Sequence, residues 1–369
     1  MEISLCMIVK DEENTIGRYL DSIKDLVDEI IIVDTGSSDT TREYAKSRGA
    51  KVFNFEWIDD FSKARNYSFS QATKDYILWM DANEILNEND IQKFNDLKNL
   101  ITENSIDSVT MNCALNIDEN NQVTSSIRQN RLVKRLSNFQ WIGATNEYLN
   151  VHGNIVHSDI TIINKKYKKC TDRNLKIYEN LLKKNELIYP RDNYYFANEL
   201  FEHKRYDEAI KYYEDFLQNN NMWTDGIKDA CYKLSDCYSM KNDYDSELKY
   251  IFKSFEYDVP RADFCCKLAY KFMCENKLDM AIYWYSLAIN AVPSNVSMSI
   301  IHHDTYTYIP WIQLCICHFR KGNFDSAYFS NEMAGKYKPT DSFVKHNRDL
   351  LKDKIKKDTV DEVKKYIPQ

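Results

Sequence analysis

Short polar segments rich in carboxylates follow three apolar runs near the start of the chain. They are Lys10-Asp11-Glu12, Asp34-Thr35-Gly36 and Asp81-Ala82-Asn83-Glu84. Carboxylate and amide oxygens bind Mg²⁺ and Mn²⁺, and such a cation neutralises the charge of a phosphate group. If a nucleotide binds at these segments, a divalent metal held by Asp81 is therefore the candidate for neutralising its phosphates.

The apolar runs themselves are predicted strands of a parallel sheet, because they are short and nearly continuous in apolar residues. They are Ile3–Val9, Glu29–Val33, Lys51–Phe55 and Tyr76–Met80. Residues 16–23 carry apolar side chains at helical spacing, and residues 40–47 predict a second helix. This β-α-β-α-β order predicts a doubly wound α/β sheet. Ligands of such sheets bind beyond the carboxyl ends of the strands, where the three polar segments lie.

Glycine-based phosphate sites are absent from the sequence. No Gly-x-Gly-x-x-Gly follows the first predicted strand, and no Gly-x-x-x-x-Gly-Lys-Ser/Thr motif occurs. Only 8 of the 369 residues are Gly, which leaves few for cradling phosphates. The sequence therefore argues against a Rossmann dinucleotide site and against a P-loop.

The second half of the chain carries an internal helical repeat. Four similar stretches begin at Tyr206, Tyr244, Leu278 and Phe324. Their starts lie 38, 34 and 46 residues apart, close to the 34-residue tetratricopeptide period. Such units stack into a solenoid with a concave surface suited to an extended peptide or another subunit. Two interpretations stay open: the array recognises a protein or peptide, or it supports or dimerises the first domain.

Composition and charge exclude several classes of protein. A hydrophobic content of 43% and an aromatic content of 13% exclude a mainly disordered chain. The formal net charge of -7 argues against a nucleic-acid-binding protein. Neither a signal peptide nor an apolar run of membrane-spanning length is found, so we expect no membrane insertion. The ten cysteines contain no Cys-x-x-Cys pair, which favours reduced core thiols in a cytoplasmic protein.

Five ordered motifs carry a family resemblance. They are Ile3-Ser-Leu-Cys-Met-Ile-Val-Lys-Asp-Glu-Glu13, Val27-Asp-Glu-Ile-Ile-Ile-Val-Asp-Thr-Gly-Ser-Ser-Asp39, Asp59-Asp-Phe-Ser-Lys-Ala-Arg-Asn66, Ile77-Leu-Trp-Met-Asp-Ala-Asn-Glu84 and Trp141-Ile-Gly-Ala-Thr-Asn-Glu147. With them the chain resembles the family 2 glycosyltransferases that carry tetratricopeptide repeats, a group that includes bacterial enzymes acting on peptides and flagellins. The resemblance implies a GT-A fold, a Rossmann-like and mostly parallel α/β sheet, at residues 1–185. An all-α tetratricopeptide-like solenoid at residues 186–369 would follow it.

The resemblance also implies the donor, the metal and their ligands. The donor would be a nucleotide sugar, with UDP-GlcNAc or UDP-glucose favoured, and Mn²⁺ or Mg²⁺ would assist an inverting transfer. The implied metal ligands are Asp81, Asn83 and a late histidine, His157. The implied nucleotide contacts are Lys10, Asp11, Glu12, Asp34, Arg65, Asn66 and Asp81.

Glu147 is the predicted catalytic base, because it occupies the acidic position of the family's Trp-x-Gly-x-x-His-Glu segment and an inverting transfer needs one such base. Glu84 and Asp159 remain alternatives. Trp141 is either a stacking surface for a sugar or a core residue.

Two asparagines depart from the family's pattern. Asn83 replaces the second aspartate of Asp-x-Asp and brings an oxygen without charge, and Asn146 replaces the usual histidine. The predicted function is transfer of a hexose or N-acetylhexosamine to a Ser or Thr of a protein or peptide such as flagellin. A Cys acceptor and a polysaccharide or lipid acceptor are alternatives. The asparagines also leave open a non-catalytic scaffold with a degenerate transferase domain.

Overall fold

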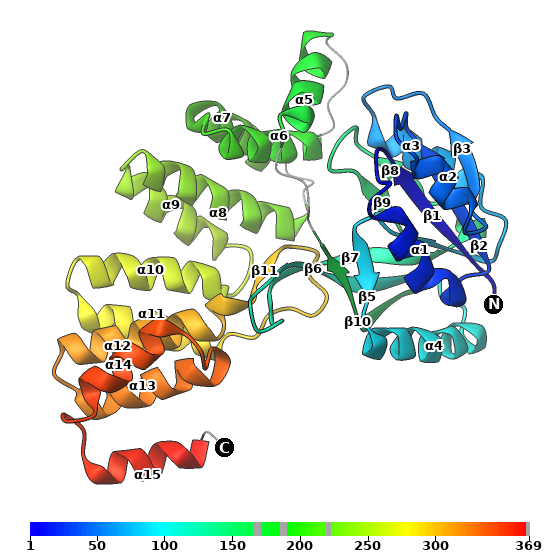
Figure 1. Ribbon diagram of the computed structural model, residues 1–369. Coiled ribbons are helices and arrows are strands. Elements are labelled where there is room, and N and C mark those ends of the chain that lie inside the picture. Colours follow the sequence, from blue (N-terminus) through cyan, green and yellow to red (C-terminus); the bar gives the residue numbers. More distant parts are fainter. Residues whose placement is uncertain (166–170, 185–189, 219–222, 367–369) are drawn as a thin grey trace. The chain divides into compact units, whose positions relative to one another are not determined.

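The computed structural model describes residues 1–165, 171–184, 190–218 and 223–366 (Figure 1). The chain forms two compact units, Met1–Met222 with Val296–Ile300, and Trp223–Asn295 with Ile301–Gln369. The predicted domain boundary between residues 185 and 186 lies outside the described residues and stays a prediction.

A mixed, mostly parallel sheet forms the centre of the first unit. Its strands are β1 (Ile3–Val9), β2 (Glu29–Asp34), β3 (Lys51–Asn54), β4 (Tyr76–Trp79), β5 (Glu84–Leu86), β6 (Ser108–Ile117), β7 (Val123–Lys134) and β10 (Ile155–Asn164). They are ordered β3-β2-β1-β4-β7-β6-β10-β5. The pairs β1–β2, β1–β4, β2–β3 and β6–β10 are parallel, whereas β4–β7, β6–β7 and β5–β10 are antiparallel. The expected GT-A-type α/β sheet is confirmed.

Helices cover both faces of this sheet (Figure 1). They are α1 (Ile16–Ile23), α2 (Thr41–Lys46), α3 (Phe61–Ser70) and α4 (Glu88–Glu103), with short 3-10 turns at Lys24–Leu26 and Arg135–Ser137. Successive strand residues point to opposite faces. Leu5 and Ile32 accordingly pack in the core that contains α1 and α4, whereas Cys6 and Ile31 pack in a second core with Trp141.

The buried carboxylate of Glu29 ties the start of β2 to its neighbours. It accepts hydrogen bonds from Ser4 Oγ at 2.6 Å and Thr73 N at 2.9 Å, and it pairs with Lys51 Nζ at 2.7 Å. Burial alone would raise the pKa of Glu29, but these donors outweigh it and lower the pKa from 4.5 to about 2. The carboxylate therefore stabilises the fold in its ionised form.

We expect Glu29→Gln to lower the free energy of unfolding by about 3 kcal/mol at neutral pH. A carboxylate whose pKa is depressed on folding contributes fully above its unfolded pKa, and this contribution is lost as the pH falls through the folded pKa. The difference between variant and wild type should thus shrink between about pH 4.5 and pH 2. Denaturant unfolding at a series of pH values measures it. Glu56→Gln, at an exposed position, is the control; a constant difference across this range would contradict the prediction.

The other elements of the described chain are helices and three short strands. In the first unit lie α5 (Arg173–Lys183), α6 (Pro190–Glu202) and α7 (Tyr206–Leu217), together with the hairpin strands β8 (Gln140–Ile142) and β9 (Tyr148–Asn150). In the second lie α8 (Thr224–Met240), α9 (Tyr244–Ser254), α10 (Ala262–Cys274), α11 (Leu278–Asn290), β11 (Ile301–His302), a 3-10 turn (His303–Thr305), α12 (Tyr308–Arg320), α13 (Phe324–Tyr337), α14 (Ser342–Leu351) and α15 (Lys357–Tyr366).

The predicted repeat corresponds to a series of helical hairpins. Its four aligned stretches begin with the first residues of α7, α9, α11 and α13. The residue two positions before each helix is left-handed, with φ of 60° at Lys204, 60° at Asn242, 58° at Asn276 and 79° at Gly322. A left-handed residue ends one helix and lets the chain reverse into the next. Each stretch is therefore the second helix of a hairpin, and the expected all-α region is confirmed.

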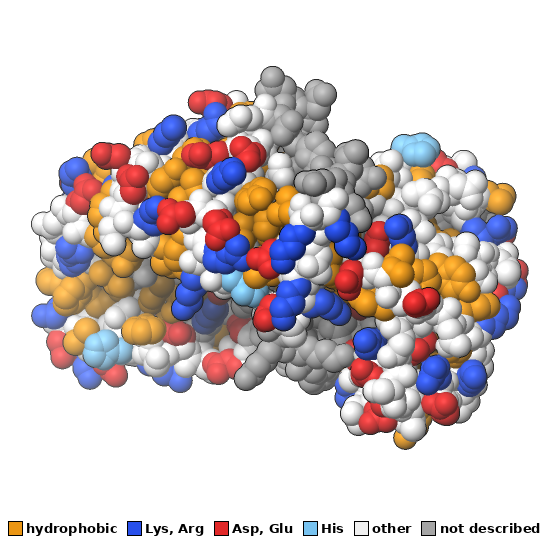
Figure 2. All heavy atoms as spheres, turned by 90° about the horizontal axis from the view of Figure 1, so that it is seen from above, with side chains coloured by type: hydrophobic (Ala, Val, Ile, Leu, Met, Phe, Trp, Pro, Cys, Tyr) orange, Lys and Arg blue, Asp and Glu red, His pale blue; other side chains and the backbone are white. Residues whose placement is uncertain are grey.

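Other sequence predictions concern thiols, charge and membranes. The nine cysteines that the structure describes are free thiols, and all but Cys274 are buried; Cys170 lies outside the described residues. On the described surface in Figure 2, basic and acidic side chains are interspersed. Among the helices in the described ranges, none is long and apolar enough to cross a membrane.

Candidate active site

A cavity of about 730 Å³ lies in the first unit at the carboxyl edge of β1 and β4. Its wall contains Lys10, Asp11 and Glu12 after β1, and Asp81 and Asn83 after β4. A volume of this size is in the range of pockets for small molecules and cofactors. Thr35, after β2, also lines the cavity, so the structure brings all three predicted polar segments to it.

The loops after β1 and β2 are bound to each other. Asp11 Oδ1 accepts hydrogen bonds from Ser38 N at 2.8 Å and Ser38 Oγ at 3.2 Å. Glu12 N donates to Thr41 Oγ1 at 2.7 Å. Because these bonds join the two loops, Asp11 and Glu12 form a fixed part of the wall.

Asp34 lies at the end of β2, just below this wall. It is 1% exposed and does not line the cavity, although its register partner Val9 and its neighbour Thr35 do. Its Oδ1 accepts hydrogen bonds from the backbone N–H groups of Gly36 and Ser37, at 3.1 and 3.0 Å. Among the described residues, Oδ2 has no hydrogen-bond partner. Asp34, predicted to contact the nucleotide, is therefore beside the wall and not in it, with one buried carboxylate oxygen that has no partner among the described residues.

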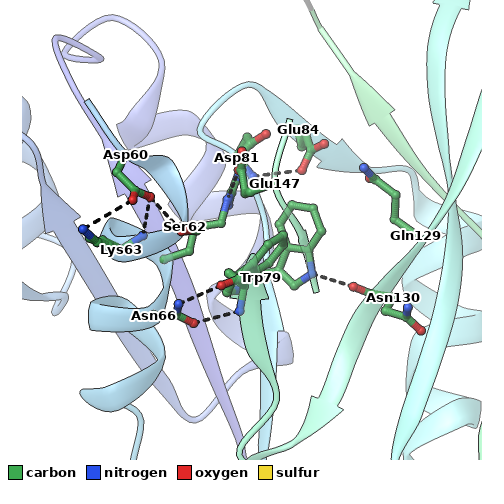
Figure 3. Close-up of polar contacts among 12 residues, drawn as sticks. Asp60, Ser62, Lys63, Asn66, Trp79, Asp81, Glu84, Gln129, Asn130 and Glu147 are labelled. Carbon is green, nitrogen blue, oxygen red and sulfur yellow. Dashed lines mark hydrogen bonds and ion pairs between the residues drawn. The ribbon is translucent and has the colours of Figure 1, made fainter. Parts of the chain in front are cut away.

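Arg65 of α3 joins the implied metal ligand Asp81 to the predicted base Glu147. Its Nη2 donates to Asp81 Oδ1 at 2.9 Å, and its Nε donates to Glu147 Oε1 at 2.5 Å. The guanidinium lies 4.7 Å from the ring centre of Trp79 and 4.8 Å from that of Trp141. Figure 3 shows Asp81 and Glu147 close together beside Trp79. The motifs that contain Asp81 and Glu147 are far apart in the sequence, and they meet at the guanidinium of Arg65.

The opposite charges of Arg65 and the two carboxylates favour the ionised form of Arg65 and of Asp81. Burial alone would lower the pKa of Arg65, but Asp81 and Glu147 outweigh it and raise the pKa above its ordinary value. Burial alone would raise the pKa of Asp81, but the charges of Arg65 and Arg131 hold it below its ordinary value. Asp81 is therefore ionised at neutral pH, and its side chain is 38% exposed. A charged and accessible carboxylate is the form that binds a metal ion.

A short hairpin of β8 and β9 positions Glu147 in its connecting loop, residues 143–147. Gly143 has a φ of 102°, a conformation in which other residues are strained. Phe61 N donates to Ala144 O at 2.8 Å, which ties the loop to the start of α3. Trp141, in β8, is 4% exposed and packs among aromatic rings in the core, although one edge reaches the cavity.

Asn66 is not in the wall, contrary to its predicted contact with the nucleotide. Its Nδ2 donates to Trp141 O at 3.0 Å, and its Oδ1 accepts from Trp141 N at 2.9 Å. These two bonds fix β8 against α3. Asn66 therefore holds the hairpin that carries Glu147 and does not face the ligand space.

The metal ligands implied by the resemblance are only partly brought together. Asn83 lines the cavity, and its Nδ2 donates to Asn164 Oδ1 at 3.0 Å, which leaves its own Oδ1 as an acceptor. His157 is absent from the cavity wall and lies near the start of β10, seven residues before Asn164 or roughly 20 Å along the strand. Its Nδ1 instead contacts Thr110 Oγ1 at 2.8 Å. Within the described ranges, no group of three His, Cys, Asp or Glu side chains could hold a metal. His157 is therefore not part of the candidate metal site.

The two alternative bases also lie outside the cavity wall. Glu84 is 3% exposed and forms a two-pronged ion pair with Arg131. Asp159 is exposed and pairs with Lys93 at 2.9 Å. Glu147 is therefore the one predicted base that the structure brings to the cavity.

Several wall residues were not predicted from the sequence. They are Trp57, Phe61, Gln129, Arg173 and Asn174, among others. Phe61 falls inside the motif that ends at Asn66, and Trp57 just precedes that motif. The motif could therefore have indicated that these two residues lie near the site. Arg173 begins α5, and its guanidinium lies 4.5 Å from the Phe61 ring centre. Nothing in the local sequence marks Arg173 or Gln129.

The sheet and its cavity define a GT-A-type α/β domain. Residues 4–167 match the model of glycosyl transferase family 2. This range contains β1 to β10 and the cluster of Arg65, Asp81 and Glu147. The first unit therefore contains a family 2 glycosyltransferase domain.

Three relatives illustrate the similarity. A TPR repeat-containing protein of Synechococcus elongatus is 52% identical over 85 residues, 23% of this chain and 21% of that protein. An uncharacterized glycosyltransferase of Rickettsia typhi is 37% identical over 87 residues, 24% of this chain and 30% of that protein. The SPbeta prophage-derived glycosyltransferase SunS of Bacillus subtilis is 26% identical over 258 residues, 66% of this chain and 60% of that protein. The matches thus span between 21% and 60% of these relatives' lengths.

Proposed function

We propose that this protein is an inverting glycosyltransferase that moves a hexose or N-acetylhexosamine from a UDP-sugar to a hydroxyl of a protein or peptide. The observation that carries the proposal is the pair of carboxylates, Asp81 and Glu147, joined by Arg65 in one cavity at the carboxyl edge of the sheet.

The nucleoside would bind where the loops after β1 and β2 are joined. Uracil offers one N–H donor and two carbonyl acceptors, and ribose offers hydroxyls. The unpartnered Oδ2 of Asp34 is suited to accept one of these donors, which would end the cost of a buried oxygen without a hydrogen bond. Lys10, Asp11 and Glu12 would form the rim of the base pocket.

Asp81 and Asn83 fit a divalent cation shared with a diphosphate. Mg²⁺ is usually held by one or two carboxylates, substrate phosphates and water rather than by a full protein cage. One ionised carboxylate and one amide oxygen in the same wall match that pattern. When bound, Mn²⁺ or Mg²⁺ would stabilise the charge that develops on the UDP leaving group. Arg173, an exposed residue of the wall, would add positive charge.

Glu147 would act as the base in the transfer. Its carboxylate takes the proton of the acceptor hydroxyl while the hydroxyl oxygen bonds to the anomeric carbon. The bond from that carbon to the diphosphate oxygen breaks on the opposite side, and UDP leaves with the electron pair. Arg65 orients the carboxylate through its Nε. Asp81, which would hold the cation, and the base are thereby fixed relative to one another.

The choice of acceptor follows from the helical hairpins. The helical hairpins that follow the transferase domain have the architecture of repeats that bind extended peptides, which favours Ser or Thr of a protein such as flagellin, with Cys as the alternative. A polysaccharide or lipid acceptor is the second candidate. The similarity to a TPR repeat-containing protein supports the first.

Incubation of the purified protein with a panel of UDP-sugars and Mn²⁺ tests the proposal. Thermal protection identifies the donor, and mass spectrometry then detects that sugar on candidate acceptor proteins. Protection by one UDP-sugar, stronger with Mn²⁺ than with EDTA, is the expected result. If no UDP-sugar protects the protein and no UDP is released, the chain is a scaffold rather than an enzyme.

A further inference from the structure

A buried ion pair lies behind Asp81 and has no part in the chemistry proposed above. Glu84, at the start of β5, accepts hydrogen bonds from Arg131 Nη1 at 2.6 Å and Nη2 at 2.7 Å. Both side chains are 1% exposed. Arg131 comes from β7, which runs antiparallel to β4. The pair therefore joins the end of the parallel strands to the antiparallel half of the sheet.

Glu84 forms hydrogen bonds with both the backbone N–H and the backbone carbonyl of Asp81. Asp81 N donates to the Glu84 carboxylate at 2.9 Å, and Glu84 N donates to Asp81 O at 3.1 Å. The two bonds close the turn from residue 81 to residue 84, which also contains Asn83. The position of the Glu84 carboxylate thus sets the turn that carries Asp81 and Asn83. Figure 3 shows Glu84 beside Asp81.

Arg131 contacts both Glu84 and Trp79, the last residue of β4. Its Nη1 donates to Trp79 O at 3.3 Å, and its guanidinium lies 3.8 Å from the Trp79 ring centre. Its Nη2 also donates to Gln129 Oε1, a cavity residue, at 2.6 Å. Arg131 therefore connects β7 to the end of β4 and to the turn that follows β4.

Stability alone does not account for such a pair. Removing two charges from water costs several kcal/mol per ion, and replacing a buried pair by apolar residues is often neutral or stabilising. Groups behind a metal ligand, by contrast, orient it, and losing them costs about 10- to 100-fold in metal affinity. In some proteins, buried ionic groups specify one conformation rather than add stability.

We propose that Glu84 and Arg131 form a positioning pair that sets the Asp81–Glu84 turn for binding the metal and the UDP diphosphate. The proposal rests on the proposed function. On this proposal, the affinity for the nucleotide depends on two residues that contact neither the cation nor the sugar.

Calorimetric titration of UDP in the presence of Mn²⁺ tests this proposal. Arg131→Met is expected to weaken UDP binding about tenfold or more. The matched control is Arg128→Met on the same strand. Arg128 is 8% exposed and donates to Thr110 Oγ1 at 3.0 Å and Ser158 O at 2.7 Å, away from the Asp81 turn. This variant should lose stability and keep its affinity for UDP.

The double variant Glu84→Met/Arg131→Leu separates positioning from folding. It removes both charges together, so we expect a Tm equal to or above that of wild type and the same loss of UDP affinity of about tenfold or more. A folded double variant that binds UDP like wild type overturns the proposal. Should the double variant not fold, the comparison of Arg131→Met with Arg128→Met decides: weaker UDP binding in Arg131→Met alone supports the positioning role, and equal binding in the two variants refutes it.

The wild type provides the remaining distinction. If wild-type protein fails to bind UDP with Mn²⁺, the proposed function itself fails. If wild type binds and the double variant binds equally well, only the positioning role fails.

Discussion

Replacing Asp81 by alanine is expected to lower Mn²⁺-dependent release of UDP by about 100- to 1,000-fold, because the lost metal stabilisation is worth about 3 to 4 kcal/mol in the transition state. Asp81 is the one carboxylate among the two implied metal ligands in the wall, since Asn83 brings no charge. Loss of Asp81 therefore leaves no anionic protein ligand at the proposed metal position. Measurement of UDP release from the protecting UDP-sugar, across a range of Mn²⁺ concentrations, gives the effect.

Two further variants make the result for Asp81 specific. Asp81→Asn keeps the size of the side chain and a hydrogen-bond acceptor for Arg65, so a similar loss there assigns the effect to the charge. Asp159→Asn removes an exposed carboxylate that pairs with Lys93 outside the cavity, and it should leave UDP release unchanged. Equal and slow release by wild type and Asp81→Ala with every donor would instead indicate a non-catalytic scaffold.

The sequence was informative where geometry follows directly from chain order. Carboxyl ends of neighbouring parallel strands meet at one edge, so the order of the strands alone was enough to assign Lys10 and Asp81 to one site. The four repeat helices were also predictable, because the stretches that begin them resemble one another. Glu147 required the family motif, since it lies in a hairpin loop that the strand pattern does not predict.

Adjacent residues of a motif need not share a role, as Arg65 and Asn66 demonstrate. Consecutive side chains of a helix point about 100° apart. Arg65 accordingly faces the cavity, while Asn66 faces the backbone of Trp141. The motif that ends at Asn66 predicted nucleotide contacts for both residues, because the order of residues in a motif does not show which way each side chain points. The prediction for His157 failed for a different reason: its residue type suits a metal, but it lies near the start of β10, whereas the end of that strand, at Asn164, contacts Asn83.

The pair of Glu84 and Arg131 could not be anticipated from residue types. Charged side chains are seldom fully buried, so Arg131 in the polar stretch of β7 gives the appearance of a surface residue. Its burial depends on the pairing of β7 with β4, which is a contact between segments about fifty residues apart. The consequence is that metal affinity in this domain is proposed to depend on the antiparallel half of the sheet, where the sequence offers no chemical motif.

Glu147→Gln is expected to bind the UDP-sugar like wild type and to lose transfer by about 100- to 10,000-fold, the usual worth of a positioned general base. The glutamine carbonyl can still accept the hydrogen bond from Arg65 Nε, so the hairpin loop and the cavity should keep their shape. The amide has no basic oxygen with which to take the acceptor proton. Calorimetry gives donor affinity, and mass spectrometry of the glycosylated acceptor gives the transfer rate.

Comparison with Asp81→Ala shows why this experiment separates two roles within one cluster. Asp81→Ala should impair both donor binding and transfer, whereas Glu147→Gln should impair transfer alone, although both side chains contact the same arginine. Undiminished transfer by a folded Glu147→Gln would eliminate Glu147 as the base. The Arg65–Glu147 pair would then be an anchor for the hairpin, since Phe61 and Asn66 already tie that hairpin to α3.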